Sequence, residues 1–308
     1  MNGILNIFKP KGISSFKVVK EVRNILGVKK AGHAGTLDPS ASGVLLVCLD
    51  QATKIVKFMT ELKKHYIGEM ILGISTTTYD SEGEIIQIKK VNTDIDEKII
   101  NNVFQKYKGT ISQIPPMFSS VHYKGERLYN LARKGIEVKR NPRKIKIYQL
   151  NLINFVKRKN PIIKFEVVCS KGTYIRTLCN DIGNELGCGA YLSSLVRKEI
   201  GNFNIENSLK LEDLKKDPTL GKKYLITIDS ALNDLERITI KADEIKTIMN
   251  GGIILKRQTI KNQEESKIKK GKLIKILDAQ GNLLAIGLQI IKNREDIIIK
   301  PVKIFKNL

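Results

Sequence analysis

Residues 31–43 have the sequence Ala31-Gly32-His33-Ala34-Gly35-Thr36-Leu37-Asp38-Pro39-Ser40-Ala41-Ser42-Gly43, and this stretch decides how the rest of the chain is interpreted. It places one carboxylate, Asp38, between glycines and just before the apolar run 44–49, which is typical of a strand covered on both faces. A loop at the start of a core strand can be held rigidly, so Asp38 is the leading candidate for a nucleophile or a base. The dipeptide Asp38-Pro39 also has a structural interpretation, because proline favours a turn or a helix start.

The segments around this loop predict a mixture of strands and helices. Strands are expected over about 4–8, 64–74, 144–156 and 162–169, and helices are expected to end at Gly27, Thr60, Gly109 and Gly187. The two-residue period of the strand over 64–74 puts Tyr66 on one face, where it could border a cleft. For a lone tyrosine, a place in the core or on the surface is the more common outcome.

Two further features indicate a charged ligand. Residues 110–144 contain Ile114-Pro115-Pro116 and a basic run over 139–144, so we expect a mobile arm that closes on a charged ligand. Arg176 lies in the first turn of a helix, where a cation opposes the helix dipole at a cost of about 0.3–1 kcal/mol. A nearby anion explains this position, and a solvated arginine is the alternative.

The composition favours a nucleic-acid partner. The 308 residues include 54 Lys and Arg against 31 Asp and Glu, which gives a formal net charge of +23. Such an excess indicates a polyanionic partner, although a lysine-rich proteome would raise the charge of every surface in the same way. After about residue 235 the pattern changes to short alternating strands, so we predict a large domain over 1–235 and a small β-rich domain over 236–308.

Other function classes receive little support from the motifs. The four cysteines form no C-x-x-C pair and the three histidines form no His-x-x-x-His motif, so we expect neither a zinc site nor a disulfide framework. The glycines of residues 31–43 match no nucleotide-binding pattern, and no apolar run is long enough to cross a membrane. We therefore expect no metal, no cofactor, no membrane contact and a cytoplasmic location.

Four motifs in a fixed order resemble those of one family. They are Lys9-Pro10-Lys11-Gly12-Ile13-Ser14-Ser15, residues 31–43, Ile114-Pro115-Pro116 with Leu128-Tyr129 and Ala132-Arg133, and Ser170-Lys171-Gly172-Thr173-Tyr174-Ile175-Arg176. The match runs over most of residues 3–235, and these motifs resemble those of the TruB family of bacterial tRNA pseudouridine synthases. The tail is similar to the PUA domain that this family carries, with weaker motifs.

The resemblance implies isomerisation of a uridine in the T-loop of tRNA, at position 55 in tRNA numbering, without a cofactor. It implies an α+β (mixed α/β) fold with a central, mostly antiparallel sheet and a small β-barrel, PUA-like tail. Asp38 would be the catalytic aspartate, Tyr66 the aromatic residue that stacks on the target base and could act as a base, and Arg176 the partner of the carboxylate. RNA contacts would come from Lys9, His33, Asp80, Arg140, Arg143, Lys171 and Tyr174.

Some of these roles have simpler alternatives. His33 would fill the space of the flipped nucleotide, although for His33 alone a loop histidine with satisfied hydrogen bonds is the slightly favoured interpretation. Asp80 could be an ordinary turn aspartate. Thr77, Phe118 and His122 depart from the family pattern, and we expect the last two to change how the arm grips RNA.

The expected partner is the T-arm stem-loop of tRNA, bound by a monomer that needs no guide RNA and no protein partner. One alternative is an RNA-binding or RNA-folding protein without chemistry, which the charge and the tail would serve equally well. Another is a related synthase that acts on a different RNA or needs a guide RNA. The combination of Asp38, Tyr66 and Arg176 favours the enzyme, because binding alone does not require it.

Overall fold

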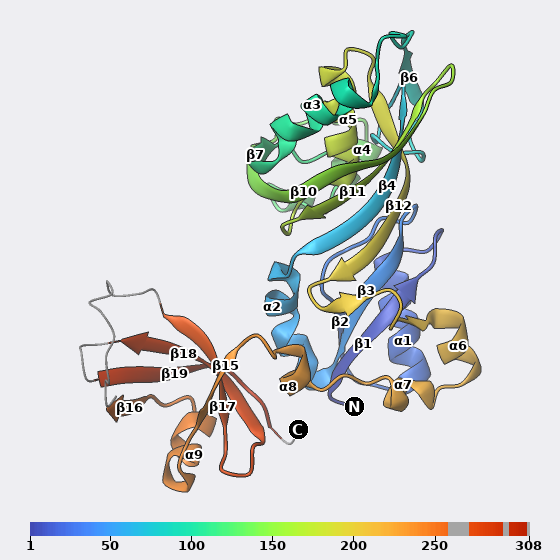
Figure 1. Cartoon of the computed structure of the whole chain (residues 1–308). Helices are drawn as coiled ribbons and strands as arrows, with labels where there is room; N and C mark the ends of the chain where they lie inside the picture. Colours follow the sequence, from blue (N-terminus) through green and yellow to red (C-terminus); the bar gives the residue numbers. More distant parts are fainter. Residues whose placement is uncertain (258–270, 292–295, 307–308) are drawn as a thin grey trace.

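The computed structural model describes residues 1–257, 271–291 and 296–306, and its main feature is a ten-stranded sheet (Figure 1). Along the order β14-β1-β3-β12-β4-β11-β10-β7 the strands are Leu209–Lys210, Gly3–Lys9, Ser42–Leu49, Ala190–Ile200, Lys64–Leu72, Ile162–Cys169, Arg143–Val156 and Gly109–Gln113. The short strands β2 (Ala31–His33) and β13 (Phe203–Asn204) pair with β3 and β12. Among the described pairings of this sheet, only β1 with β14 and β3 with β12 are parallel. The predicted mixed fold with a mostly antiparallel sheet is confirmed.

The segments that flank Asp38 fold as predicted. Helix α1 (Ser15–Leu26) is capped by Ser14, whose hydroxyl accepts an amide hydrogen bond of 3.2 Å, and it ends at Gly27 with a φ of 62°. Helix α1 packs against β1 and β3, and β3 is buried along almost its whole length. Strand β2 pairs with the distal end of β3, so the loop between them crosses from one strand to its neighbour.

The helix expected over 51–60 is divided in two. Its first part, η1 (Asp50–Ile55), is a 3-10 helix, and α2 (Val56–Glu61) follows directly. The Asp50 carbonyl accepts a 2.6 Å hydrogen bond from the Thr53 hydroxyl. This local bond competes with the regular α-helical pattern and favours the tighter first turn.

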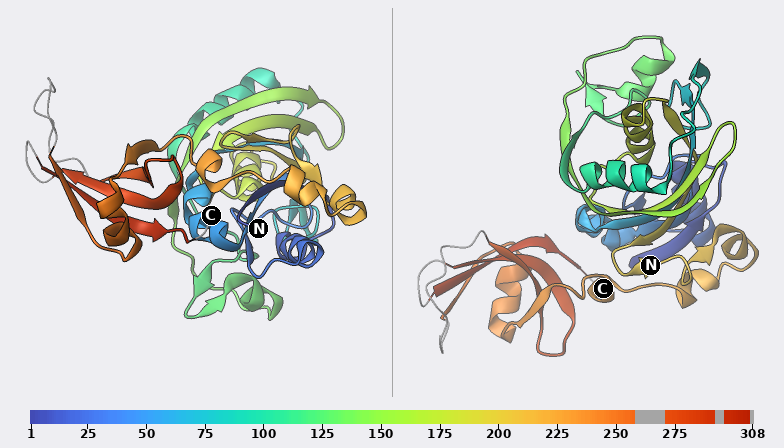
Figure 2. Two further views of the ribbon diagram at one scale, coloured as in Figure 1. Left: turned by 90° about the horizontal axis from the view of Figure 1, so that it is seen from below. Right: turned by 45° about the horizontal axis from the view of Figure 1, so that its top comes forward.

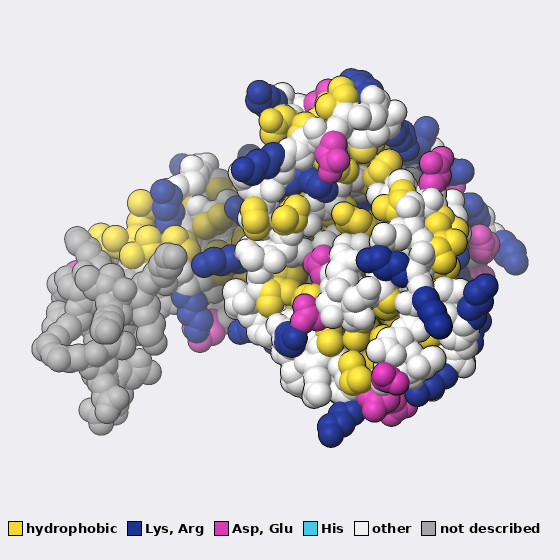
Figure 3. Space-filling model, turned by 90° about the horizontal axis from the view of Figure 1, so that it is seen from above, with side chains coloured by type: hydrophobic (Ala, Val, Ile, Leu, Met, Phe, Trp, Pro, Cys, Tyr) yellow, Lys and Arg dark blue, Asp and Glu magenta, His cyan; other side chains and the backbone are white. Residues whose placement is uncertain are grey.

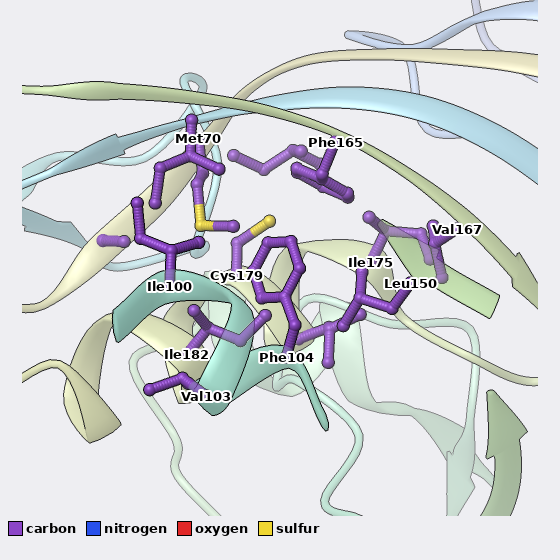
Figure 4. Packing of buried hydrophobic residues seen from close by; sticks show 14 of the residues in the cluster. Met70, Ile100, Val103, Phe104, Leu150, Phe165, Val167, Ile175, Cys179 and Ile182 are labelled. Carbon is purple, nitrogen blue, oxygen red and sulfur yellow. The ribbon is translucent and has the colours of Figure 1, made fainter. Parts of the chain in front are cut away.

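Two helices cover one face of the sheet (Figure 4). They are α3 (Glu97–Tyr107) and α5 (Ile175–Glu185), which pack on β4 and on the predicted hairpin of β10 and β11. The rings of Phe104 and Phe165 meet edge to face with centroids 6.4 Å apart. This packing fixes the first turn of α5, which carries Arg176.

The arm over 110–144 leaves the sheet at β7 and returns at β10 (Figure 2). It contains the short strands β8 (His122–Tyr123) and β9 (Glu126–Arg127) and the helix α4 (Leu128–Arg133). A separate pair of strands, β5 (Ile74–Thr76) and β6 (Ile85–Ile88), lies on either side of the turn that carries Asp80. No helix among the described residues has the length and apolar character needed to cross a lipid bilayer.

The tail forms a second sheet that curls into a half-barrel, in the order β15-β17-β18-β19-β16. In this order its strands are Glu236–Thr239, Lys272–Leu277, Leu283–Ile291, Asp296–Ile304 and Ile254–Arg257, and α9 (Ala242–Met249) packs on them. The linking helices are α6 (Leu211–Lys216), α7 (Leu220–Lys223) and α8 (Ile228–Ala231). Leu283, Ile286 and Phe305 of the tail join a buried cluster with Ile4 and Met59. The boundary at 235 and the assignment of a PUA domain stay predictions.

Candidate active site

The loop that carries Asp38 is held by polar groups beneath it. Lys9 at the end of β1 is fully buried, and its ammonium donates to the carbonyls of Pro10, Ile13 and Pro39 at 2.9, 2.6 and 3.4 Å. The Ser15 hydroxyl accepts from the Leu37 amide at 2.8 Å and donates to the carbonyl of the same residue at 2.9 Å. Both backbone groups of the residue before Asp38 are therefore fixed, as is the carbonyl of the residue after it.

Arg197 of β12 holds the same loop from the other side. Its guanidinium, which is only 1% exposed, donates to the carbonyls of Val44 at 2.7 Å and Gly35 at 3.0 Å. It also lies 6.0 Å from the centre of the Tyr66 ring. A Cβ atom at Gly43 would stand 2.2 Å from the Arg197 carbonyl oxygen, so this close approach requires glycine. Arg197 thus connects the loop, the start of β3 and Tyr66.

Arg176 brings three separate segments together at Asp38. Its Nη2 lies 3.4 Å from Asp38 Oδ2 and donates to the Phe118 carbonyl at 2.5 Å, while its Nη1 donates to Asp80 Oδ2 at 3.1 Å. The Arg176 side chain is 7% exposed, whereas that of Asp38 is 41% exposed. An anion was expected near Arg176, and the structure places two carboxylates there, those of Asp38 and Asp80. Of the two, Asp38 is the one that opens toward solvent.

Asp80 is placed to orient Arg176. It is 2% exposed, and its Oδ1 accepts from the Thr78 hydroxyl at 2.5 Å and from the Glu82 amide at 3.0 Å. Asp80 is thus used by groups of the protein in this structure, and the RNA contact expected of it stays a prediction. The buried ammonium of Lys9 likewise donates to three backbone carbonyls, and its RNA contact also stays a prediction.

The charges of the site act on Asp38 in opposite directions. The surrounding protein raises the pKa of Asp38 by desolvation, and Asp80 adds to the effect, while Arg176, Lys9 and Arg197 lower it. The pKa of Lys9 falls to about 8, chiefly because of its burial. A carboxylate whose pKa is raised in this way is a stronger proton acceptor than an ordinary aspartate once it is ionised.

Tyr66 and His33 border the site with neutral rings. Burial raises the pKa of Tyr66, which is 7% exposed, so its hydroxyl stays protonated. Tyr66 was expected to border a cleft, and with 7% of its surface exposed it presents only an edge of its ring. His33 is half-buried at the end of β2, and burial followed by the charge of Arg197 lowers its pKa. A neutral histidine ring at the start of the loop suits stacking on a base.

The remaining predicted RNA contacts lie farther out. Tyr174 precedes α5, and its backbone is held by two hydrogen bonds of 2.9 and 3.0 Å with the Gln113 side chain. Lys171 is half-exposed and pairs with Glu61. Arg140 donates to the Pro115 carbonyl at 3.3 Å and holds the arm, whereas Arg143 is exposed at the start of β10.

Sequence reasoning did not single out Arg197 or Ser15. Ser15 stands in the first motif, but nothing in that motif indicated that its hydroxyl binds the Leu37 amide, while its neighbour Ser14 caps the helix. Arg197 lies on β12, a strand that the pattern of residues 190–200 did not reveal. Among the described residues, no group of three His, Cys, Asp or Glu side chains is arranged to hold a metal ion.

This geometry agrees with what the chain is similar to. Residues 23–175 match the N-terminal domain of the TruB family of pseudouridylate synthases, and residues 176–238 match the C-terminal domain of tRNA pseudouridylate synthase B. The protein named tRNA pseudouridine synthase B in Clostridium kluyveri is 44% identical over 308 residues, which cover 99% of this chain and 100% of that protein. The protein of the same name in Clostridium tetani is 47% identical over 251 residues, with coverage of 82% and 85%.

A solved structure shares the whole architecture. A chain of a crystallised Cbf5-Nop10-Gar1 complex superposes with a TM-score of 0.74 at 27% identity, covering 99% of this chain and 85% of that one. A fold built on one mostly antiparallel sheet, with an aspartate loop held against an arginine, is that of a pseudouridine synthase. The chain belongs to the TruB family.

Proposed function

We propose that this chain isomerises a uridine in the T-loop of tRNA to pseudouridine, with Asp38 as the catalytic carboxylate. The observation that carries the proposal is the Asp38 carboxylate, open to solvent and 3.4 Å from the buried Arg176 guanidinium. The relatives named tRNA pseudouridine synthase B support tRNA as the substrate. A buried arginine held by a second carboxylate is not needed for RNA binding alone.

The target base must first leave the folded RNA loop, at a cost of a few kcal/mol. His33, at the start of the Asp38 loop, fills the space that the base vacates, and the basic arm over 110–144 holds the T-arm. Tyr66 offers the edge of its ring to the extruded base. Because burial raises its pKa, Tyr66 carries its proton before the base arrives, and we propose that its ring stacks on the extruded base.

The reaction breaks the bond from the ribose carbon to the base nitrogen and joins the same ribose carbon to a carbon of the turned base. The base carbon C5 loses its hydrogen as a proton and the released nitrogen N1 gains a proton, so atoms and electrons balance without an oxidant or a reductant. Attack of Asp38 on the ribose, attack on the base and removal of a ribose proton all begin from the ionised carboxylate, which the Arg176 charge favours. Arg197, Lys9 and Ser15 keep the loop in place while the base turns.

We further propose that the chain acts as a monomer without a guide RNA, because the substantial basic arm over 110–144 is available to hold the T-arm directly. The likeness to a chain of a Cbf5-Nop10-Gar1 complex favours the alternative of a synthase that works in a larger assembly. An assay of the purified chain alone with a T-arm hairpin distinguishes the monomer without a guide RNA from the synthase that needs a larger assembly. Conversion of one loop uridine supports the proposal, and conversion only after addition of other components supports the alternative.

The role of Asp38 is tested with Asp38→Asn. This variant should bind the hairpin normally and lose roughly 10³-fold or more in single-turnover rate, because the amide cannot act as a nucleophile or a base. Asp94→Asn, which changes an exposed aspartate before α3, is the matched control and should convert the hairpin at the parent rate. Normal turnover by Asp38→Asn would exclude Asp38 as the catalytic carboxylate.

A further inference from the structure

A cavity of about 260 Å³ lies between strand β1, strand β13 and helix α8, which links the large sheet to the tail (Figure 1). Asn6, Phe203 and Ile226 are buried or half-buried where they line it, whereas Asp234 is exposed, so the cavity opens to solvent. None of the described residues that line it belongs to the Asp38 loop. The cavity is therefore separate from the candidate active site.

Asn6 brings an unpaired polar atom to this cavity. Leu5 and Ile7 pack against α1 on one side of β1, so the two-residue period of the strand points Asn6 to the other side. Asn6 is 4% exposed, and its Nδ2 donates to the Asn204 carbonyl at 2.7 Å. Its Oδ1 is buried and has no hydrogen-bond partner among the residues that the structure describes. A buried acceptor without a partner costs free energy, which a donor placed in the cavity would offset.

The hydrogen bond to Asn204 also fixes the orientation of the Asn6 amide. The opposite orientation would set the Asn6 oxygen against the Asn204 carbonyl oxygen, and two acceptors repel each other. The end of the amide that lacks a partner is therefore the acceptor. A ligand that satisfies Asn6 must present an N–H or O–H group to it.

The rest of the lining narrows the class of ligand. Phe203 and Ile226 provide an apolar surface on which a flat ring can pack. Asp234 is the only charged side chain among the described residues of the lining, so the cavity has no cation to hold a phosphate. The net charge of +23 disfavours a cationic ligand. Pockets for drug-sized ligands are about 300–1,000 Å³, so this cavity suits a smaller, uncharged molecule.

We propose that the cavity binds an uncharged nucleoside whose base carries an exocyclic amino group. The amino group donates to Asn6 Oδ1 and the base packs on Phe203. This site goes beyond the proposed function, because it shares no residue with the candidate active site. Helix α8 lines the cavity and also carries Asp229, which pairs with the buried Lys275 of β17 at 2.7 Å. A bound nucleoside would therefore hold α8 against β1 and stabilise the connection to the tail.

The test measures binding of adenosine, inosine and AMP to the purified full-length chain by calorimetry. Inosine has a carbonyl oxygen where adenosine has the amino group, so it should bind roughly 10-fold or more weakly than adenosine. AMP should bind no more tightly than adenosine, because no described residue of the lining pairs with a phosphate. Tighter binding of AMP would mean that the base arrives with a phosphate, from a nucleotide or an RNA, and would overturn the uncharged ligand.

Two variants test the cavity itself. Asn6→Leu removes the acceptor and should weaken adenosine binding roughly 10-fold or more. Because this change also leaves the Asn204 carbonyl without its donor, Ala231→Leu is the second variant, which fills the cavity from α8 and keeps that hydrogen bond. It should weaken binding to a similar extent. Asn24→Leu, which changes an exposed asparagine of α1, is the matched control and should bind adenosine like the parent.

Hydrogen exchange locates the bound adenosine. Protection should increase over residues 202–207 and 226–234 and stay unchanged in the Asp38 loop. Protection in that loop alone would place the nucleoside in the candidate active site and overturn the proposal. Absence of binding at about 1 mM adenosine, or parent-like binding by both cavity variants, would overturn it as well. Turnover of the T-arm hairpin by the parent tests the proposed function separately.

Discussion

The loop around Asp38 and the arm over 110–144 are held in place by different kinds of contact. Three buried or half-buried groups, Lys9, Ser15 and Arg197, bind backbone atoms of the loop. The arm is tied within itself by exposed ion pairs such as Lys134 with Glu126, which contribute about 0–1 kcal/mol each. We therefore expect the loop to keep a fixed geometry and the arm to adapt to a ligand, a division that suits chemistry at one and recognition at the other.

The two regions meet at one residue. Arg176 contacts Asp38 on the loop side and the Phe118 carbonyl at the root of the arm. Figure 3 shows the molecule from above, with Lys and Arg side chains spread around the margin of this face and Asp and Glu side chains less frequent. Arm and loop thus share an anchor, and changes to Arg176 should affect both.

Arg176→Lys should have the largest effect in this comparison. A lysine keeps the charge, but one ammonium cannot reach Asp38, Asp80 and the Phe118 carbonyl with the geometry of a planar fork. We expect roughly a 10²- to 10³-fold loss in kcat. Single-turnover assays with saturating hairpin measure it, and a thermal melt checks that the variant is folded. A rate within a few-fold of the parent would show that Asp38 does not depend on this arginine.

Lys9 gives the loop a measurable signature in stability against pH. Its pKa is lowered to about 8 in the folded protein from 10.5 in the unfolded chain, so the buried charge costs stability below pH 8. As the pH rises from about 8 toward 10.5, the folded state releases its proton first and stability increases. Relative to Lys9→Met, the free energy of unfolding of the parent should rise by on the order of 2 kcal/mol across this window.

Denaturant titrations at several pH values provide the measurement. Lys64, whose pKa is also lowered to about 8 by burial, is present in both proteins and cancels in the difference. Parallel curves for the two proteins would mean that the Lys9 ammonium is hydrated and does not support the loop.

Arg197→Lys should separate positioning from binding. The shorter side chain cannot hold the Gly35 and Val44 carbonyls together, so the loop is expected to lose its fixed geometry. We expect kcat to fall about 10-fold with KM for the hairpin unchanged, because the Arg197 side chain is buried beneath the loop and acts through the position of Asp38. A rise in KM with normal kcat would contradict a positioning role.

The sequence predicts those residues of the site whose signals are local, and it does not predict those that depend on contacts with distant residues. Asp38 and Arg176 were singled out from a glycine-bounded loop and from a cation at the wrong end of a helix, and both signals are local. The role of Arg197 was not predicted, because it depends on hydrogen bonds to the carbonyls of Gly35 and Val44, which lie more than 150 residues away in the sequence. Lys9 was expected at the RNA from the family resemblance alone, and its place beneath the loop follows from the two-residue period of β1, which carries it inward together with Leu5 and Ile7.

Substitutions in the arm should give the smallest effect, and they should change KM where the substitutions at the loop change kcat. Arg127, Lys139 and Arg143 are exposed, and none of them touches the loop. Changing all three to alanine should raise KM for the hairpin about three- to ten-fold through lost phosphate contacts, while kcat at saturation stays near that of the parent. Adding salt should narrow the gap between variant and parent, since the contacts removed are electrostatic. If kcat fell instead, the arm would be part of the rigid site and the contrast with the Asp38 loop would fail.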